Sequence, residues 1–121
     1  MPSTSPTTQP TLLVTCLCAQ WCNTCGAYRA LFDQMQERFP ALRFQWIDVE
    51  DEADLVDPIE VENFPTLLIS APHQARFFGT VTPHAQTLLR LIESLLGGDA
   101  PALPGTAALD ALVDRLWQLP R

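Results

Sequence analysis

A nearly continuous apolar run extends from Leu12 to Ala19 and is typical of a strand buried on both faces of a sheet. A helical pattern follows, with apolar residues at every fourth position, Ala27, Leu31, Met35 and Phe39, and with Tyr28 and Phe32 flanking them. Leu42 to Val49 then predicts a second strand. The order strand–helix–strand implies that the two strands are parallel and that the helix connects them in a right-handed crossover.

The middle of the chain predicts a β-hairpin. Glu50 to Val56 is expected to form a short acidic helix, which Pro58 ends. Two further strands, Pro65 to Ile69 and Ala75 to Phe78, are separated by a short turn around His73. Because the strands of a hairpin are antiparallel, the complete sheet is expected to be mixed.

The C-terminal part predicts two amphipathic helices. The first is expected to begin at Thr82 and Pro83, a hydroxyl cap followed by proline, and to end at Gly97. Its apolar face consists of Ala85, Leu88, Ile92 and Leu95. The second helix is expected over residues 106–117, with an apolar face of Leu109, Leu112, Val113 and Leu116.

A length of 121 residues fits one domain. Residues 1–10 are rich in Ser, Thr, Pro and Gln and predict a disordered leader. Residues 11–96 are expected to form the domain, 97–105 a linker, and 106–121 a C-terminal helix packed on the domain. Together these elements predict an α/β fold, with a mixed four-stranded sheet flanked by helices.

The formal net charge is −7, and every basic residue is Arg. Such a surface has no basic patch for nucleic acid or an anionic membrane, so neither is expected as a partner. No apolar run approaches the roughly 18 residues of a membrane helix. No basic residue precedes Leu12, so the charged start of a signal peptide is missing, and a cytoplasmic protein is expected.

Acidic side chains concentrate between Asp48 and Glu62, and no basic residue occurs between Arg43 and Arg76. A solvated face is the simplest interpretation. The alternative is partner selection, in which an acidic rim beside Phe64 attracts basic partners and repels acidic ones.

Four cysteines, Cys16, Cys18, Cys22 and Cys25, are clustered in one short segment. Cysteines that staple a secreted domain are spread out to close long loops, so clustering indicates redox chemistry or a metal site. Core packing is favoured for Cys16 and Cys18, with a thiol relay to Cys25 or an alternative disulfide as the second hypothesis. A four-cysteine zinc or iron–sulfur site is disfavoured, because the spacing differs from that of paired knuckles.

Cys22 and Cys25 lie where the first strand ends and the first helix begins. Their separation places them on one helical turn, where the two sulfurs can meet. The free N–H groups of a helix N-terminus stabilise a thiolate, which is the species that attacks a disulfide. Cys22 is therefore expected to attack, and the more buried Cys25 to resolve the mixed disulfide. The alternatives for this pair are two small buried residues or half of a zinc site.

Several segments resemble the thioredoxin family. One is Ala19-Gln20-Trp21-Cys22-Asn23-Thr24-Cys25, and another is Phe64-Pro65-Thr66-Leu67-Leu68-Ile69, which is similar to the family's cis-proline strand. Trp46 to Glu50 and Gly79 also match. The resemblance covers about residues 11–96. It implies a thioredoxin-like fold, here with a shortened N-terminus and an extra C-terminal helix.

The resemblance also implies roles for individual residues. Cys22 and Cys25 correspond to the catalytic pair, and Pro65 to a cis proline packed against their disulfide. Trp21 would cover the site, and the backbone of Phe64 would pair with an extended substrate segment. The implied partners are a disulfide-containing substrate and a reductase or low-molecular-weight thiol as electron donor. Neither a metal nor an organic cofactor is implied.

The chain departs from the family pattern around this site. Cys16 stands in place of a buried Asp, and Trp46 in place of its Lys partner. Cys18 replaces an aromatic residue, and Asn23-Thr24 replaces Gly-Pro. Cys16, Cys18, Asn23 and Thr24 are therefore expected to modulate the site.

Two hypotheses for function follow. The first is a thiol–disulfide oxidoreductase that reduces disulfides through Cys22 and Cys25 and contributes to cell redox homeostasis. The second is a thioredoxin-fold binding module with vestigial or regulatory thiols. A metal carrier that uses all four cysteines is a weaker third hypothesis.

Overall fold

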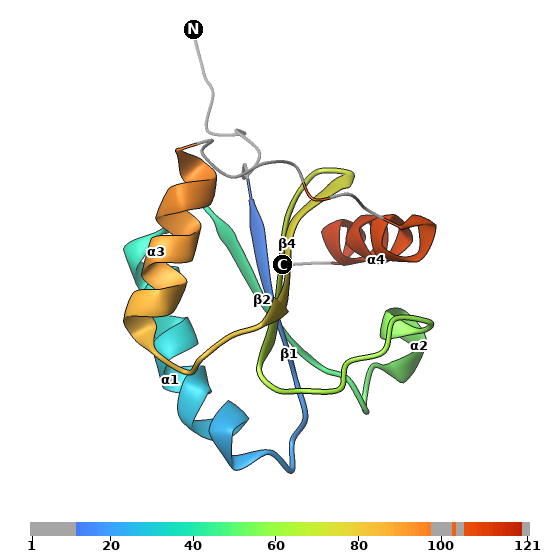
Figure 1. Ribbon diagram of the computed structural model, residues 1–121, viewed down its shortest axis with the longest axis horizontal. Coiled ribbons are helices and arrows are strands. Elements are labelled where there is room, and N and C mark those ends of the chain that lie inside the picture. The colour runs from blue at the N-terminus through green and yellow to red at the C-terminus, as the bar shows by residue number, and fades with distance from the viewer. Residues whose placement is uncertain (1–11, 98–102, 104–105, 120–121) are drawn as a thin grey trace, which may run out of the picture.

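A computed structural model describes residues 12–97, 103 and 106–119, and Figure 1 shows its arrangement. The first half contains β1 (Leu13–Cys18), α1 (Asn23–Arg38), β2 (Arg43–Asp48) and α2 (Ala53–Val56). The second half contains β3 (Thr66–Ala71), β4 (Gln74–Thr80), α3 (Ala85–Leu96) and α4 (Ala107–Gln118). The predicted leader 1–10 and most of the predicted linker 97–105 lie outside the described residues.

The sheet has the strand order β2-β1-β3-β4. β1 pairs in parallel with β2 and antiparallel with β3, and β3 pairs antiparallel with β4. The predicted mixed four-stranded sheet is therefore confirmed. The β3–β4 turn is shorter than expected, because Gln74 already pairs with Ala71. His73 has a positive φ of 66°, a conformation that tight hairpin turns require.

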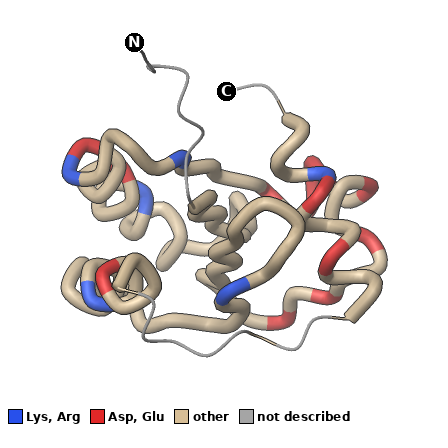
Figure 2. Tube along the Cα trace, turned by 90° about the horizontal axis from the view of Figure 1, so that it is seen from above, with Lys and Arg blue, Asp and Glu red and all other residues tan. Residues whose placement is uncertain are grey.

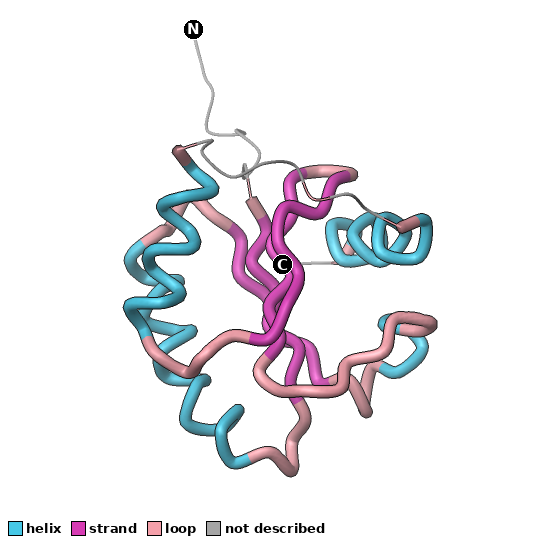
Figure 3. Tube along the Cα trace, in the orientation of Figure 1, coloured by secondary structure: helices cyan, strands magenta, loops and turns pink. Residues whose placement is uncertain are grey.

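Helices cover both faces of the sheet, with α1 and α3 on one side and α2 and α4 on the other (Figure 3). Residues of β1 alternate between the two cores. Cys16 and Cys18 join the core under α1 and α3, whereas Leu13 and Leu17 join the core under α4. Because both faces are covered, β1 is buried throughout, as its continuous apolar sequence predicts.

The buried face of α1 differs from the predicted stripe. The helix buries Cys25, Tyr28, Phe32 and Met35, whereas Ala27 is exposed and Leu31 and Phe39 are half-buried. Phe32 explains this rotation, because its ring packs edge-on against Phe44 and Trp46 of β2, with centroids 5.5 and 5.6 Å apart. Large aromatic rings bury more apolar area than the alanine of the predicted stripe. The rotation turns Cys25 towards the sheet.

α3 begins later than predicted. His84 is its N-cap residue and Ala85 its first residue, whereas Thr82 uses its hydroxyl to contact that of Thr87 at 3.1 Å. Leu88, Ile92 and Leu95 are buried as expected, and Gly97 is the C-cap. The predicted acidic helix is also shorter, since α2 spans only Ala53–Val56.

α4 packs on the sheet through its apolar face, and side-chain hydrogen bonds also hold it there. Thr106 caps the helix by accepting a hydrogen bond from Leu109 N at 3.1 Å. Arg43 of β2 donates to the carbonyls of Trp117 and Leu119. Trp117 is half-buried, and its indole N–H donates to Ser70 Oγ at 3.0 Å. None of the described helices is long and apolar enough to cross a membrane.

Candidate active site at the β1–α1 junction

A tight turn between β1 and α1 positions Cys22. Cys22 N donates to Ala19 O at 3.0 Å, and Gly26 N donates to Cys22 O at 3.2 Å, which is the first hydrogen bond of the helix. Cys22 is the N-cap residue and makes no side-chain capping bond. Cys22 therefore lies at the N-terminal, positive end of the α1 dipole.

Cys22 and Cys25 differ sharply in exposure. Cys22 is partly exposed, whereas Cys25 is only 2% exposed. A substrate disulfide arriving from solvent can therefore meet Cys22 but not Cys25. Asn23 and Thr24, between the two cysteines, are exposed on the first turn of α1.

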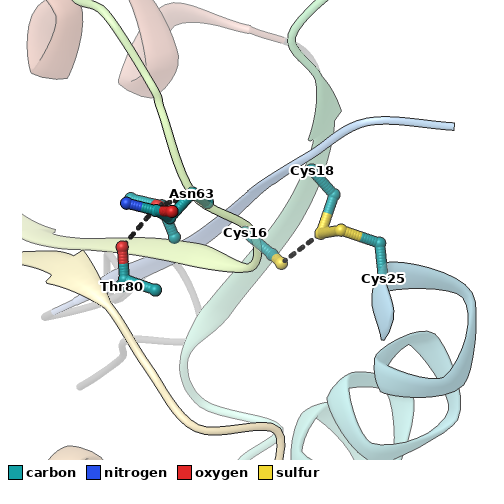
Figure 4. The surroundings of a disulfide bond; sticks show 6 residues. Cys16, Cys18, Cys25, Asn63 and Thr80 are labelled. Atoms are coloured by element: carbon teal, nitrogen blue, oxygen red, sulfur yellow. Dashed lines mark hydrogen bonds between the residues drawn. A yellow bond between two sulfur atoms is a disulfide. The ribbon is translucent and has the colours of Figure 1, made fainter. Parts of the chain in front are cut away.

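The disulfide of this structure joins Cys25 to Cys18, whereas the sequence favours a Cys22–Cys25 pair (Figure 4). The Cα atoms of Cys18 and Cys25 are 5.9 Å apart, within the usual range for a disulfide. Cys18 is 1% exposed, so both sulfurs lie beneath the first turn of α1. Cys16 and Cys22 are free thiols. The sequence leaves an alternative disulfide open but does not specify its two cysteines.

Cys16 lies behind this disulfide. Its Sγ is 3.5 Å from Cys18 Sγ, and the two side chains share one face of β1. Burial raises the pKa of the Cys16 thiol to about 12, and the Arg29 guanidinium partly offsets this effect. Cys16 is therefore a protonated thiol at neutral pH.

Arg29 is a residue near the site that sequence analysis did not single out. It lies one turn after Cys25 on α1, and its guanidinium stacks 4.7 Å from the ring centroid of Trp46. Trp46 in turn is the register partner of Cys16 and is half-buried rather than fully in the core. The spacing of four residues from Cys25 is the signal that would have identified Arg29.

The two motif segments meet at the mouth of the site. The rings of Trp21 and Phe64 pack edge-to-face with centroids 5.6 Å apart, and Trp21 is 65% exposed. The Phe64–Pro65 peptide bond is cis and Pro65 is buried. Val81 N donates to Pro65 O at 3.2 Å. An exposed apolar surface therefore borders the partly exposed Cys22.

A pocket of about 310 Å³ opens on the other side of Cys25. Its lining residues are Ala19, Gln20, Cys25, Gly26, Arg29, Trp46 and Asp48. Asp51 N and Glu50 N donate to Asp48 Oδ1 at 3.0 and 2.9 Å and lower the pKa of its carboxyl. The pocket thus presents an ionised carboxylate and a guanidinium beside the buried sulfur. A larger pocket of about 720 Å³ lies along the end of α1 and β2 and contains no cysteine.

Acidic residues form a surface beside the site. Those of α2 and the loops around it gather on one side of the chain trace (Figure 2). Most are exposed, including Glu60 and Glu62, which precede Phe64. Among the described residues, no group of three or more metal-ligating side chains is arranged to hold an ion.

A cysteine pair at the β1–α1 junction beside a cis proline defines a protein of thioredoxin-like architecture, and comparison with known proteins agrees. A family model described as Thioredoxin matches residues 6–93. The chain belongs to the thioredoxin family.

Two curated thioredoxins match part of the chain. Thioredoxin-1 of Saccharomyces cerevisiae is 31% identical over 61 residues, which are 50% of this chain and 59% of the yeast protein. A thioredoxin of Ophiophagus hannah is 34% identical over 55 residues, which are 46% of this chain and 52% of that protein. The chain therefore spans little more than half the length of these relatives.

Solved structures share the fold at lower identity. Thioredoxin of Fasciola hepatica has a TM-score of 0.64 and 19% identity, covering 70% of this chain and 81% of that chain. Mitochondrial thioredoxin 3 of Saccharomyces cerevisiae, in its oxidised form, has a TM-score of 0.63 and 23% identity, covering 71% and 80%. A structure of a complex of ferredoxin:thioredoxin reductase and thioredoxin f2 matches with a TM-score of 0.65 and 19% identity, covering 73% and 80%.

Proposed function

We propose that the protein is a thiol–disulfide oxidoreductase that reduces disulfides of proteins or small molecules. The observation that carries this proposal is the position of a partly exposed, free Cys22 at a helix N-terminus, one turn from a buried Cys25 that forms a disulfide with Cys18. An exposed thiol can reach a substrate, and a buried one is protected from competing reactions until the substrate is attached.

The reaction proceeds in two exchanges. The Cys22 thiolate attacks one sulfur of the substrate disulfide, a mixed disulfide forms, and the first substrate thiol leaves. Cys25 then loses its proton and attacks Cys22 Sγ, so the second substrate thiol leaves and a Cys22–Cys25 disulfide forms. The substrate gains two electrons and the protein loses two. A reductase or a low-molecular-weight thiol returns them.

The surface around Cys22 supports binding of an extended substrate. Trp21 and Phe64 supply apolar contact area, and the backbone before Pro65 supplies an edge with which a peptide can pair. The acidic residues of the α2 side favour basic partners. As an electron donor we propose a reductase or a low-molecular-weight thiol, supported by membership of the thioredoxin family. A cytoplasmic location and a part in redox homeostasis remain predictions from the sequence.

The Cys25→Ser variant tests the proposal by trapping substrate. Without the resolving thiol, the mixed disulfide with Cys22 cannot be released, so a peptide disulfide is expected to remain attached one-to-one. Non-reducing mass spectrometry measures the adduct, and dithiothreitol should remove it.

The double variant Cys22→Ser, Cys25→Ser is the matched control and is expected to form no adduct at Cys22. If this double variant still binds the peptide as tightly as the wild type does, and Cys25→Ser forms no adduct, the binding-module hypothesis replaces the oxidoreductase.

A further inference from the structure

We propose that Cys18 is a second disulfide partner for Cys25. An exchange to the Cys18–Cys25 disulfide frees Cys22 and places the disulfide in the core between β1 and α1. The observations are the Cys18–Cys25 disulfide itself, the burial of both residues, and the free, partly exposed Cys22. Cys25 is thus bonded to the strand in this structure and lies one helical turn from Cys22. It can pair with a thiol on either side.

The step is an internal thiol–disulfide exchange. It rests on the proposed function for its starting material, the Cys22–Cys25 disulfide left after a substrate has been reduced. Cys18 loses a proton and its thiolate attacks Cys25 Sγ. The Cys18–Cys25 bond forms, the Cys22–Cys25 bond breaks, and the electron pair leaves on Cys22 Sγ. No electrons enter or leave the protein.

Local structure favours this direction of exchange. Cys22 is the leaving group, and its side chain is partly exposed, so water can solvate the sulfur as it leaves. The exchange also replaces the buried Cys18 thiol with the partly exposed Cys22 thiol, so one polar S–H group moves from the core shared by α1 and α3 to the surface. Both effects lower the free energy of the product.

Cys16 is a positioning residue for this exchange. Its sulfur contacts Cys18 Sγ at 3.5 Å, and its high pKa keeps it protonated, so it can donate its S–H to the Cys18 sulfur. Such a donor stabilises the attacking Cys18 thiolate.

The exchange gives the oxidised protein a distinct surface chemistry. A Cys22–Cys25 disulfide leaves only the buried Cys16 and Cys18 as thiols, whereas a Cys18–Cys25 disulfide leaves Cys22 free at the surface. The oxidised protein therefore still presents one reactive thiol. Reduction of the Cys18–Cys25 disulfide requires the reverse exchange. In that exchange Cys22 attacks Cys25 and re-forms the Cys22–Cys25 disulfide, whose Cys22 sulfur is accessible from solvent.

Differential alkylation of the full-length oxidised chain tests the pairing. The reduced protein is oxidised with oxidised dithiothreitol, labelled with iodoacetamide while native, and labelled with N-ethylmaleimide after denaturation. Trypsin leaves all four cysteines on one fragment, because the first basic residue is Arg29. Chymotryptic cleavage after Trp21 separates Cys16 and Cys18 from Cys22 and Cys25. A Cys18–Cys25 bond then joins two fragments, and a Cys22–Cys25 bond joins none.

We expect joined fragments in most oxidised molecules, with iodoacetamide on Cys22 and N-ethylmaleimide on Cys16. The Cys18→Ala variant should instead retain a Cys22–Cys25 disulfide and take no iodoacetamide. The Cys16→Ala variant should keep the joined fragments at equilibrium, because Cys16 forms no disulfide. It should form them more slowly than the wild type, because it lacks the S–H donor to the Cys18 thiolate.

The proposal is overturned if joined fragments are a minority in the wild type, whichever other pairing dominates. That outcome leaves the proposed function untouched, because the function is tested by the rate of disulfide reduction and by the covalent adduct at Cys22 in Cys25→Ser. If the disulfide is found between Cys22 and Cys25 and the protein still reduces disulfides, the proposed function stands and the role of Cys18 is refuted.

Discussion

The Cys22→Ser variant is expected to reduce a peptide disulfide at least about 100-fold more slowly than the wild type. Serine has a similar size, but its hydroxyl is not ionised at neutral pH and does not attack sulfur. The α1 N-terminus can stabilise an anion at this position only if a group that ionises is present. The measurement is the single-turnover rate of the reduced protein with a fluorogenic peptide disulfide, which needs no added electron donor.

The control for this variant is Cys16→Ala, which also removes a thiol, but from a fully buried position that forms no disulfide. A much smaller loss is expected there than in Cys22→Ser. Unfolding curves of both variants check that each is folded. Turnover by Cys22→Ser at the wild-type rate would show that another group attacks the substrate.

Leu112→Ala is expected to lower the free energy of unfolding by about 2–5 kcal/mol. Leu112 is fully buried in α4, in the core that also contains Leu13 and Leu17 of β1. Its truncation leaves a cavity between α4 and the sheet. Hydrogen bonds from Arg43 and Trp117 hold α4 in place, so the helix cannot move to fill this cavity. Urea unfolding of the reduced protein measures the change.

Gln118→Ala is the matched control, because Gln118 lies on the same helix and is exposed. A change within about 0.5 kcal/mol is expected for it. An unfolding midpoint of Leu112→Ala equal to that of the wild type would mean that α4 is not part of the cooperative core.

The sheet and the faces of α3 and α4 were predictable because their patterns are unambiguous. In α3, the helical spacing of Leu88, Ile92 and Leu95 defines one apolar face. In α4, the same spacing defines one apolar face formed by Leu109, Leu112, Val113 and Leu116. The β1 run also specifies a strand covered on both sides, because no polar face interrupts it.

The face of α1 and the start of α3 were less predictable. α1 has apolar residues on more than one face, and contact of Phe32 with two rings of β2 decides between them. This contact joins segments that are distant in sequence, so it cannot be predicted from helical periodicity alone. At α3, Thr82 is a good cap by type, but its hydroxyl contacts Thr87 and His84 takes the cap position.

The disulfide partner of Cys25 illustrates the same limit within the site. Spacing along one helical turn favours Cys22, since that spacing is visible in the sequence. The approach of Cys18 depends on how β1 ends beneath α1, which is a tertiary distance. The shared face of Cys16 and Cys18 was predictable, because side chains two apart in a strand point the same way.

A thiol-trapping redox titration is the most direct test of the central claim that Cys25 belongs to a redox-active pair. The protein is equilibrated in buffers of defined potential and alkylated, and modified cysteines are counted by mass. We expect one transition that involves two thiols, with a midpoint near about −270 mV for a reductase. It should persist in Cys18→Ala and vanish in Cys25→Ser. Absence of any two-thiol transition in the wild type would contradict the account.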